Sequence, residues 1–294
     1  MNNFESNIKN IYGKRGQEWL QNLPKLVMDA ALKYDLHSLE PVSNLSYNYV
    51  LSGFQNDKSV ILKLSPNNET LEMEALALNS FAGHGGVNII DRADGLLLMQ
   101  RIIPGISLKK HFPAREGAAI NIACALIKKL RLAKIPSGHN LPHIKEWLGV
   151  LDKDLEIPSN YLQKAQHLRD KLLLGSGTDI LLHGYLHHDN ILLNRDQEID
   201  DWLAIDPKGV IGDRAYEVVA FIINPIPELL EHADAHQIIQ KRLIAFSNGL
   251  NIPYNRIKDW CFVQSVLAWT WGLEDNCDTT GFERMVDIYA QLQR

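Results

Sequence analysis

The periodicity of the apolar residues changes part-way along the chain, and this change limits the possible folds more than any other feature. Residues 46–65 contain two short β-type runs, "SYNYVLSG" and "SVILKLS", separated by the turn-forming "FQNDK", and so predict a hairpin. A helix with an asparagine-rich start at Asn67 and a glycine stop at Gly83 is predicted next, and "LLLMQRI" at 96–102 predicts another strand. Later segments are mainly helical in period: 114–133, 143–151, 160–174, 227–248 and 256–272. The pattern predicts an α+β protein, with a small β-rich lobe over residues 1–102 and a larger, mainly helical lobe over residues 103–294.

The first lobe begins with a helical extension and contains two glycine clusters. Residues 17–36 repeat apolar positions at helical spacing on both sides of Pro24. The cluster "GKRG" at 13–16 lacks the spacing of a phosphate-binding loop, and "GHGG" at 83–86 follows a helix, where glycines commonly end helices. The small polar residues of "SNLSYN" at 43–48, Ser46 among them, could instead cover a phosphate with their backbone N–H groups.

Composition excludes several classes of protein. Of the 294 residues, 46% are hydrophobic and 22% charged, which is typical of a globular protein with a substantial core. The net charge of −5 comes without a block of lysines or arginines, so we expect no nucleic-acid partner. The sequence shows neither a signal peptide nor the roughly 18 apolar residues of a membrane span, which favours a cytoplasmic protein without membrane contact. Cys124, Cys261 and Cys277 are far apart and in no CxxC spacing, so we expect neither disulfides nor a thiolate metal site.

A second hairpin is predicted where "ILLN" and "WLAID" flank the charged "RDQEIDD". Asn190 precedes the first of these strands and Asp206 ends the second, so an antiparallel pairing brings the two residues side by side. An amide oxygen and a carboxylate are ligands that Mg²⁺ takes in nucleotide sites, where water and phosphate oxygens complete the shell. The alternative is that Asn190 is a turn residue and that Asp206, before Pro207, only shapes the chain.

A lysine inside an apolar strand also needs an explanation. Lys63 lies within "VILKL" and must either reach solvent or find an anionic partner. On the following helix Glu74 falls on the apolar face, whereas Glu69 and Glu72 point elsewhere. A strand lysine paired with a helix carboxylate is the arrangement that holds nucleotide phosphates in kinases. The alternative is that Lys63 lies on the solvent-exposed face of an edge strand.

Three histidines close to one acidic residue allow a different chemistry. His183, His187 and His188 with Asp189 could ligate Zn²⁺ or Fe²⁺ and would then suggest a hydrolase. No second histidine-rich segment completes such a site, and neighbouring histidines point apart in an extended strand. The hydrolase therefore ranks below the phosphate-binding alternative.

The order of these elements resembles the protein-kinase-like fold. Within that fold it resembles the aminoglycoside phosphotransferase family, whose catalytic loop reads H-G-D-x-x-x-x-N and is followed by an aspartate in I-D. The segments "LSYNYVL", "LLHGYLHHDNILL", "WLAIDPKGVIGDRAYE" and "WGLEDN" are most similar to the branch of streptomycin 6-kinases and aminoglycoside or hydroxyurea resistance kinases. The resemblance spans nearly the whole chain. It implies transfer of the γ-phosphoryl group of ATP, with Mg²⁺, to an alcohol of a small and cationic molecule, an aminoglycoside such as streptomycin.

The resemblance also implies roles on the nucleotide side of the site. Lys63 would contact the α- and β-phosphates, and Glu74 would orient it. Ser46 would lie in the loop over the phosphates. The hinge beneath the adenine would run through Met99, Gln100 and Ile102.

For catalysis and for the acceptor, the resemblance implies two further sets of residues. The catalytic set comprises His183, Tyr185, Asp189, Asn190 and Asp206, with the last two holding the metal. The acceptor contacts comprise Trp271, Glu274 and Asp275. Acidic groups there suit a guanidinium or ammonium substrate, although a solvated helix end explains each of them equally well.

The chain departs from the family at Tyr185, which stands where the family has the carboxylate that orients the acceptor hydroxyl. A phenol with an ordinary pKa near 10 is a poor proton acceptor at pH 7. Three explanations stay open: a disabled kinase that survives as a nucleotide-binding pseudokinase, a base role taken over by Asp189, or residual transfer without a base. The acceptor and its hydroxyl, the choice between ATP and GTP, and the oligomeric state are likewise open.

Overall fold

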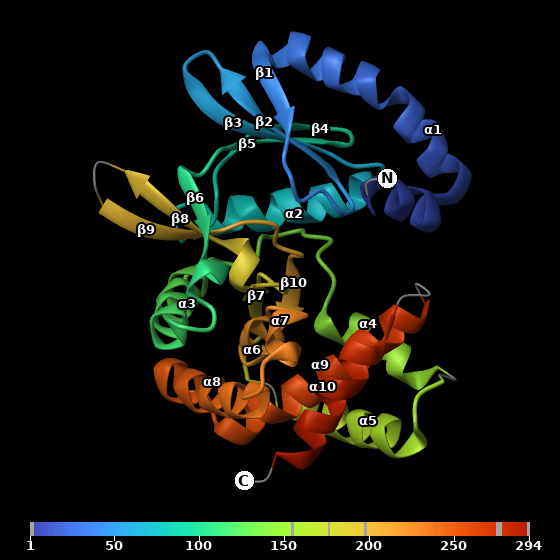
Figure 1. The fold of residues 1–294 in the computed structure, drawn as a ribbon, viewed down its shortest axis with the longest axis vertical. Helices are drawn as coiled ribbons and strands as arrows, with labels where there is room; N and C mark the ends of the chain where they lie inside the picture. Colours follow the sequence, from blue (N-terminus) through green and yellow to red (C-terminus); the bar gives the residue numbers. More distant parts are fainter. Residues whose placement is uncertain (1–2, 154–155, 176, 197–198, 275–277, 293–294) are drawn as a thin grey trace.

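A computed structural model of the protein describes residues 3–153, 156–175, 177–196, 199–274 and 278–292. Figure 1 shows a sheet with two helices above a mainly helical part. The upper part consists of α1 (Asn3–Tyr34), β1 (Leu36–Pro41), β2 (Tyr49–Gln55), β3 (Lys58–Leu64), α2 (Asn68–Phe81), β4 (Ile89–Ala93) and β5 (Leu96–Gln100). Its strands form an antiparallel sheet in the order β1–β2–β3–β5–β4.

The two faces of this sheet have different neighbours. Leu62 and Leu64 pack with α1 in one apolar cluster, whereas Ile61 belongs to a second cluster with residues of α2. Because side chains alternate along a strand, Lys63 shares the face of Ile61 and points towards α2. Figure 1 shows α2 between the sheet and the lower part of the molecule, and α1 arching along the opposite side. The lysine is therefore directed at the junction between the two lobes.

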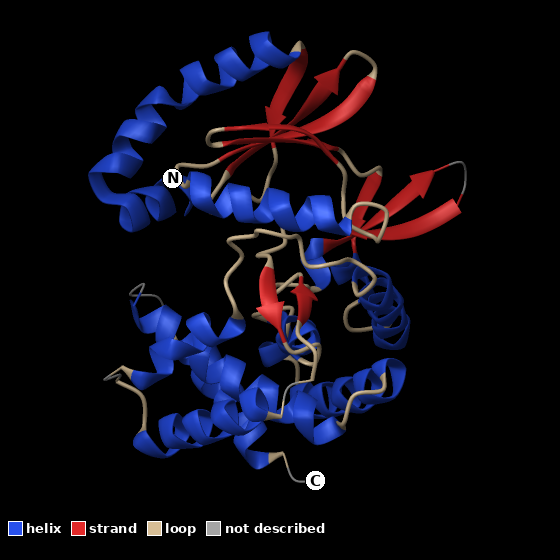
Figure 2. Ribbon diagram, turned by 180° about the vertical axis from the view of Figure 1, so that it is seen from behind, coloured by secondary structure: helices blue, strands red, loops and turns tan. Residues whose placement is uncertain are grey.

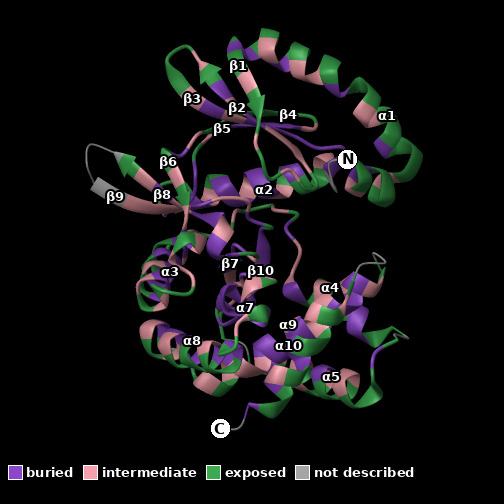
Figure 3. Ribbon diagram, in the orientation of Figure 1, coloured by how far each residue is buried: buried purple, intermediate pink, exposed green. Residues whose placement is uncertain are grey.

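The lower part contains two short sheets and is otherwise mainly helical (Figure 2). It consists of β6 (Pro104–Ser107), α3 (Glu116–Leu130), α4 (Ile144–Leu148), α5 (Ser159–Leu174), β7 (Ile180–Leu182), β8 (Ile191–Asp196), β9 (Ile199–Ala204), β10 (Val210–Gly212), α6 (Val219–Ile223), α7 (Glu228–Glu231), α8 (Ala235–Leu250), α9 (Tyr254–Glu274) and α10 (Thr280–Gln291). The strands β6, β8 and β9 pair in that order, and β10 pairs with β7. Buried residues run through α9 and the inner strands (Figure 3), and the fully buried Trp260 lies in this core. Among the described helices, none combines the length and the apolar composition that crossing a membrane requires.

Several predicted boundaries are wrong. The first helix begins at Asn3, not at residue 17, and it breaks at Gly13 (φ 53°, ψ −128°), whereas Pro24 lies inside it. The helix predicted over 227–248 is two helices, α7 and α8. The first strand of the second hairpin runs on to Asp196, and the second runs from Ile199 to Ala204, so Asp206 lies two residues past the strand that it was predicted to end.

Several elements that show little periodicity were not predicted. The strands β1 and β4 are mostly exposed, β6 begins at a proline, and β7 and β10 are three residues long. The helices α6 and α10 were missed as well. The two-lobed arrangement and the predicted hairpins are nevertheless present. The boundary between residues 102 and 103 stays a prediction.

Candidate active site

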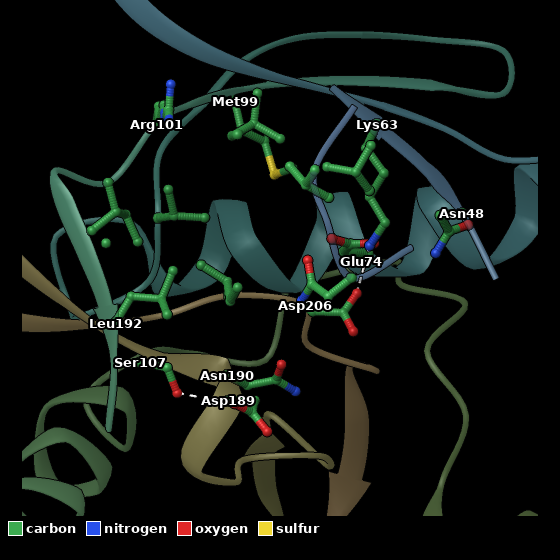
Figure 4. Close-up of a pocket in the computed structure, with 18 of the residues that line it drawn as sticks. Asn48, Lys63, Glu74, Met99, Arg101, Ser107, Asp189, Asn190, Leu192 and Asp206 are labelled. Carbon is green, nitrogen blue, oxygen red and sulfur yellow. Dashed lines mark hydrogen bonds and ion pairs between the residues drawn. The ribbon is translucent and has the colours of Figure 1, made fainter. Parts of the chain in front are cut away.

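Lys63 is held between two carboxylates at the junction of the lobes. Its Nζ lies 2.6 Å from Oε2 of Glu74 and 2.5 Å from Oδ1 of Asp206 (Figure 4). Lys63 and Glu74 are each only 5% exposed. Burial opposes the charged lysine, but Asp206 and Glu74 together raise the pKa of Lys63 well above its ordinary value. The predicted pair is therefore present, and a third charge joins it.

Asp206 is brought to this pair by the second hairpin. Ile191 pairs with Ala204 at the end of the ladder, and the N–H of Ile205 donates to the carbonyl of Asn190 at 3.0 Å. Asp206 follows with φ 58°, a left-handed conformation that costs a non-glycine residue roughly 1 kcal/mol or more and often marks a functional position. Burial opposes ionisation of its carboxyl, but the nearby charges of Lys63 and Lys208 lower the pKa of Asp206 to about 2. Asp206 is thus a carboxylate at neutral pH.

Asn190 and Asp206 together fit a magnesium ion. The Nδ2 of Asn190 donates to the carbonyl of Tyr185 at 2.9 Å, which leaves the amide oxygen as the group that the side chain can offer. Figure 4 shows Asn190 below Asp206 on the same side of the cleft. Among the described residues, no group of three or more His, Cys, Asp or Glu side chains could hold a metal by itself. Two oxygen donors that rely on phosphate and water for the remaining positions match the preference of Mg²⁺.

The three histidines of the loop do not form a cluster. His183 is fully buried, where Nε2 lies 2.9 Å from the carbonyl of Ile205 and Nδ1 accepts the N–H of Tyr185 at 3.3 Å. His188 is also fully buried and stacks on Phe221 with ring centroids 3.8 Å apart. Burial lowers the pKa of His183 to about 4 and that of His188 to about 2. Both nitrogens of His183 are already hydrogen-bonded and the His188 ring is stacked on Phe221, so these histidines shape the loop, which removes the basis for a histidine-ligated hydrolase.

Tyr185 lies in the cleft at the predicted position of the catalytic carboxylate. Its side chain is 42% exposed, its ring meets the His187 ring edge-on at 4.5 Å, and Nζ of Lys208 lies 5.6 Å from its centroid. Burial, followed by the negative charge of Asp206, raises the pKa of Tyr185 above its ordinary value. His187, which also lines the cleft, has its pKa lowered to about 4 by burial. This part of the loop is therefore neutral at pH 7.

Asp189 lines the cleft with its carboxylate half-exposed. Its Oδ1 accepts a hydrogen bond from the Ser107 hydroxyl at 3.0 Å, and its Oδ2 lies 3.8 Å from Nζ of Lys109. Lys109 is shared with Glu228, at 2.6 Å. Asp189 is therefore next to Asn190, one of the two predicted metal ligands, but already has partners on β6 and the turn that follows.

The cleft itself has a volume of about 580 Å³ and receives residues from both lobes. Ser46, Met99, Gln100 and Ile102 all line it, as predicted for the residues around a nucleotide. The backbone N–H of Gln100 donates to the carbonyl of Asn88 at 2.9 Å, so this N–H is not available to an adenine. The roles assigned to these residues stay predictions.

The predicted acceptor contacts are not among the residues that line this cleft. Trp271 packs edge-on against Trp147 at 6.0 Å, and Glu274 pairs with Lys153 at 2.7 Å on the surface. Asp275 lies outside the described residues. Trp147 connects this region to the loop, because a Cβ at Gly184 would meet the Trp147 ring at 3.3 Å.

Two residues of the site were missed by sequence reasoning. Glu217 is buried and accepts the backbone N–H groups of His183 at 2.8 Å and Gly184 at 3.2 Å, so it holds the start of the loop. Burial raises the pKa of Glu217 to about 7, although the two N–H groups oppose this. Lys208 lies beside both Asp206 and Tyr185. Both residues fall within "WLAIDPKGVIGDRAYE", so the signal was present in the motif, but its individual residues were not interpreted.

Comparison with known sequences now assigns the family. The sequence model of the aminoglycoside/hydroxyurea antibiotic resistance kinases matches residues 39–276, most of the chain. The chain belongs to this kinase family. It is 23% identical to a streptomycin 6-kinase of Streptomyces glaucescens, over 90% of this chain and 87% of that protein. It is also 27% identical to a hydroxyurea phosphotransferase of Kitasatospora aureofaciens, over 72% of this chain and 64% of that protein.

Solved structures confirm the predicted protein-kinase-like fold. A thermostable mutant of the aminoglycoside phosphotransferase APH(4)-Ia, in a ternary complex with ADP and hygromycin B, superimposes with a TM-score of 0.68 at 13% identity, over 90% of this chain and 97% of that chain. The choline kinase LicA from Streptococcus pneumoniae gives a TM-score of 0.67 at 15% identity, over 91% and 99%. At these identities the structures establish the fold of this family member, not its substrate.

Proposed function

We propose that this family member binds magnesium–ATP in the cleft between its lobes and is built to transfer the γ-phosphoryl group to an alcohol of a small molecule, an aminoglycoside such as streptomycin, with a turnover that Tyr185 impairs. The observation that carries the proposal is the junction of Lys63 with Glu74 and Asp206, beside Asn190. Residues from both lobes meet there, and they supply the cation, the carboxylates and the amide oxygen that a bound nucleoside triphosphate and its metal require.

The charges at the junction define how the nucleotide would be held. Lys63 would donate to the α- and β-phosphates, and the ion pair with Glu74 would hold the Lys63 ammonium in position. Asp206 is ionised at neutral pH and would turn its carboxylate to the metal together with Asn190. Magnesium, when bound, would neutralise the charge of the phosphates during transfer.

For the acceptor, support comes from the relatives and from Asp189. Two streptomycin 6-kinases of Streptomyces, each aligned over about 90% of this chain, are among the similar proteins. The half-exposed carboxylate of Asp189 lines the acceptor side of the cleft and suits a guanidinium or ammonium group.

Tyr185 is the reason for expecting slow turnover. Its pKa is raised, so the phenol does not accept a proton at pH 7. Among the described residues that line the cleft, the carboxylates are Glu74, Asp189 and Asp206. Glu74 and Asp206 are bonded to Lys63, and Asp189 accepts from Ser107. Each carboxylate of this set already has a hydrogen-bond or charge partner, and loss of a general base typically costs about 10² to 10⁴ in rate.

The same residue favours a second function, that of a pseudokinase which binds nucleotide without transferring phosphate. The two functions share the nucleotide site and differ only in turnover. Product formation by the chain as it stands therefore separates them.

Calorimetric titration with AMP-PNP tests the shared part of the proposal. We expect saturable binding with excess Mg²⁺ and at least tenfold weaker binding with EDTA, because Asn190 and Asp206 can hold the nucleotide only through the metal. If AMP-PNP fails to bind with or without Mg²⁺, the proposal is wrong for both functions.

A further inference from the structure

The N-terminal segment of α1 folds back on the rest of that helix. Gly13 breaks α1, so residues 3–12 form a separate segment, which we call the N-terminal arm. The return is tight, because a Cβ at Gly16 would lie 2.4 Å from the carbonyl oxygen of Ile8. Phe4 and Ile8 of the arm are buried, 3% and 0% exposed, in the apolar cluster that α1 shares with the sheet. The arm is therefore an integral part of the small lobe.

The arm also reaches the loop at 42–48. The Nδ2 of Asn7 donates to the carbonyl of Ser46 at 3.2 Å. The ring of Phe4 lies 5.5 Å from the ring of Tyr49, the first residue of β2 after the loop. Leu45, in the middle of the loop, packs against the same apolar cluster as Phe4. These contacts fix the loop from its outer side.

The inner side of this loop faces the cleft. Val42, Asn44, Leu45, Ser46 and Asn48 all line the cavity that also contains Lys63 and Asp206. The loop 42–48 contains no glycine, and its residues are small or polar for the most part. A loop must be ordered to present backbone N–H groups to a phosphate, and ordering each residue costs conformational entropy. Contacts that order the loop before binding strengthen the binding.

From these contacts we infer that the N-terminal arm is a positioning element for the nucleotide phosphates, acting through Asn7 and Phe4 on the loop at 42–48. The inference rests on the proposed nucleotide site. The arm lies outside the part of the chain that matches the family, which begins at residue 39.

The arm acts through few contacts, which makes single substitutions informative. A cavity of about 1010 Å³ lies between α1 and the sheet and is lined by Phe4, Leu20, Leu23, Leu45 and Tyr49 among others. Phe4 therefore borders an open groove, and Asn7 reaches the loop through its hydrogen bond to Ser46. Loss of either contact should release the loop.

The test compares Asn7→Ala and Phe4→Leu with Asn10→Ala, an exposed asparagine on the same arm. Affinities for Mg–ADP and for adenosine are measured by calorimetry. We expect Asn7→Ala to bind Mg–ADP about fivefold more weakly and Phe4→Leu about tenfold more weakly, the range of one lost hydrogen bond or packing contact. Adenosine affinity should stay unchanged in both, and Asn10→Ala should match the parent protein for both ligands.

Hydrogen exchange on the nucleotide-free proteins gives a second readout. Residues 42–48 should exchange faster in Asn7→Ala and Phe4→Leu than in Asn10→Ala. Unchanged Mg–ADP affinity in both arm variants, or an equal loss for Mg–ADP and adenosine, would overturn the inference, since the second result means general destabilisation of the lobe. A parent protein that binds neither ligand would instead overturn the proposed function, and unchanged exchange in the loop would then still show that the arm does not order it.

Discussion

The two sides of the cleft differ in charge. On the nucleotide side, Lys63 is charged and lies between Glu74 and the ionised Asp206. On the loop that faces it, Tyr185 and His187 are neutral at pH 7, and the carboxylate that lines the cleft is that of Asp189. Under the proposed function, the nucleotide side has the charges that phosphate binding needs, whereas the loop opposite has a neutral phenol at the position predicted for the carboxylate that orients the acceptor hydroxyl. Under the proposed function, binding and turnover would therefore depend on separate groups of residues.

Removing the cation from the nucleotide side should have the largest effect. In Lys63→Met, Glu74 and Asp206 are left close together without a positive charge. We expect the free energy of unfolding to fall by about 3–5 kcal/mol, as for other broken buried ion pairs. Nucleotide affinity should fall at least about 100-fold, or about 2.7 kcal/mol.

Urea denaturation and calorimetric titration with Mg–ADP measure these two effects. Lys58→Met is the matched control, because Lys58 begins the same strand but is exposed. Equal stability of Lys63→Met and the control would show that Lys63 does not stabilise the fold through its ion pairs with Glu74 and Asp206.

Acid should lower the free energy of unfolding through His183 before it protonates Asp206. The folded protein holds His183 with a pKa of about 4, below the ordinary value near 6.5, so the unfolded chain takes up the proton more readily. The stability due to the neutral, buried ring is fully present above pH 6.5 and is lost as the pH falls towards 4. This loss amounts to about 3 kcal/mol for one histidine.

Unfolding free energies measured from pH 7 to pH 4 check this prediction. His183→Gln, which cannot take up the proton, should show a shallower decline than the parent protein. His236→Gln, at an exposed position on α8, should keep the parent's decline. The explanation fails if His183→Gln declines as steeply as His236→Gln.

A change of charge at Asp206 should have a smaller and more specific effect. Asp206→Asn keeps the shape of the side chain but removes the carboxylate that pairs with Lys63 and faces the metal site. We expect the gain in AMP-PNP affinity on adding Mg²⁺ to shrink by about tenfold to 100-fold, or about 1.4–2.7 kcal/mol. Asp201→Asn, which removes an exposed carboxylate paired with Lys129, should keep the full magnesium effect. An undiminished magnesium effect in Asp206→Asn would place the metal elsewhere.

The smallest effect is expected at the predicted acceptor contacts. Glu274 pairs with Lys153 on the surface, and exposed pairs of this kind contribute about 0–1 kcal/mol. Glu274→Gln should therefore leave nucleotide affinity unchanged and lower stability by less than about 1 kcal/mol. Thermal unfolding with and without Mg–ADP measures both. A loss of nucleotide affinity would connect α9 to the cleft more closely than its contacts indicate.

Much of the nucleotide side was predictable from the sequence, because local periodicity determines which way its side chains point. The alternation in β3 and the helical face of α2 were sufficient to pair Lys63 with Glu74. The hairpin was sufficient to bring Asn190 near Asp206. The bond between Lys63 and Asp206 was not predictable in the same way, since 143 residues separate them and their contact depends on how the lobes meet.

The acceptor side was less predictable for a related reason. Glu217 supports the loop from a separate segment of the chain, and no local pattern shows that its carboxylate is buried under His183 and Gly184. The kink of α1 depends on the conformation of Gly13 and not on Pro24, because the backbone at Pro24 stays helical within a long helix. Periodicity predicts which face of an element is buried, but not which distant segment covers it.

Phosphoryl transfer by residue-185 variants tests the central claim most directly. The parent protein, Tyr185→Asp and Tyr185→Phe are incubated with Mg–ATP and streptomycin, and phosphorylated streptomycin is measured by mass spectrometry over time. We expect Tyr185→Asp to form product about 10² to 10⁴ times faster than the parent protein, because it restores a carboxylate where the acceptor hydroxyl is oriented. Tyr185→Phe should match the parent, and all three should bind AMP-PNP with similar affinity. Rapid product formation by the parent protein, with no gain in Tyr185→Asp, would contradict the claim that Tyr185 limits turnover.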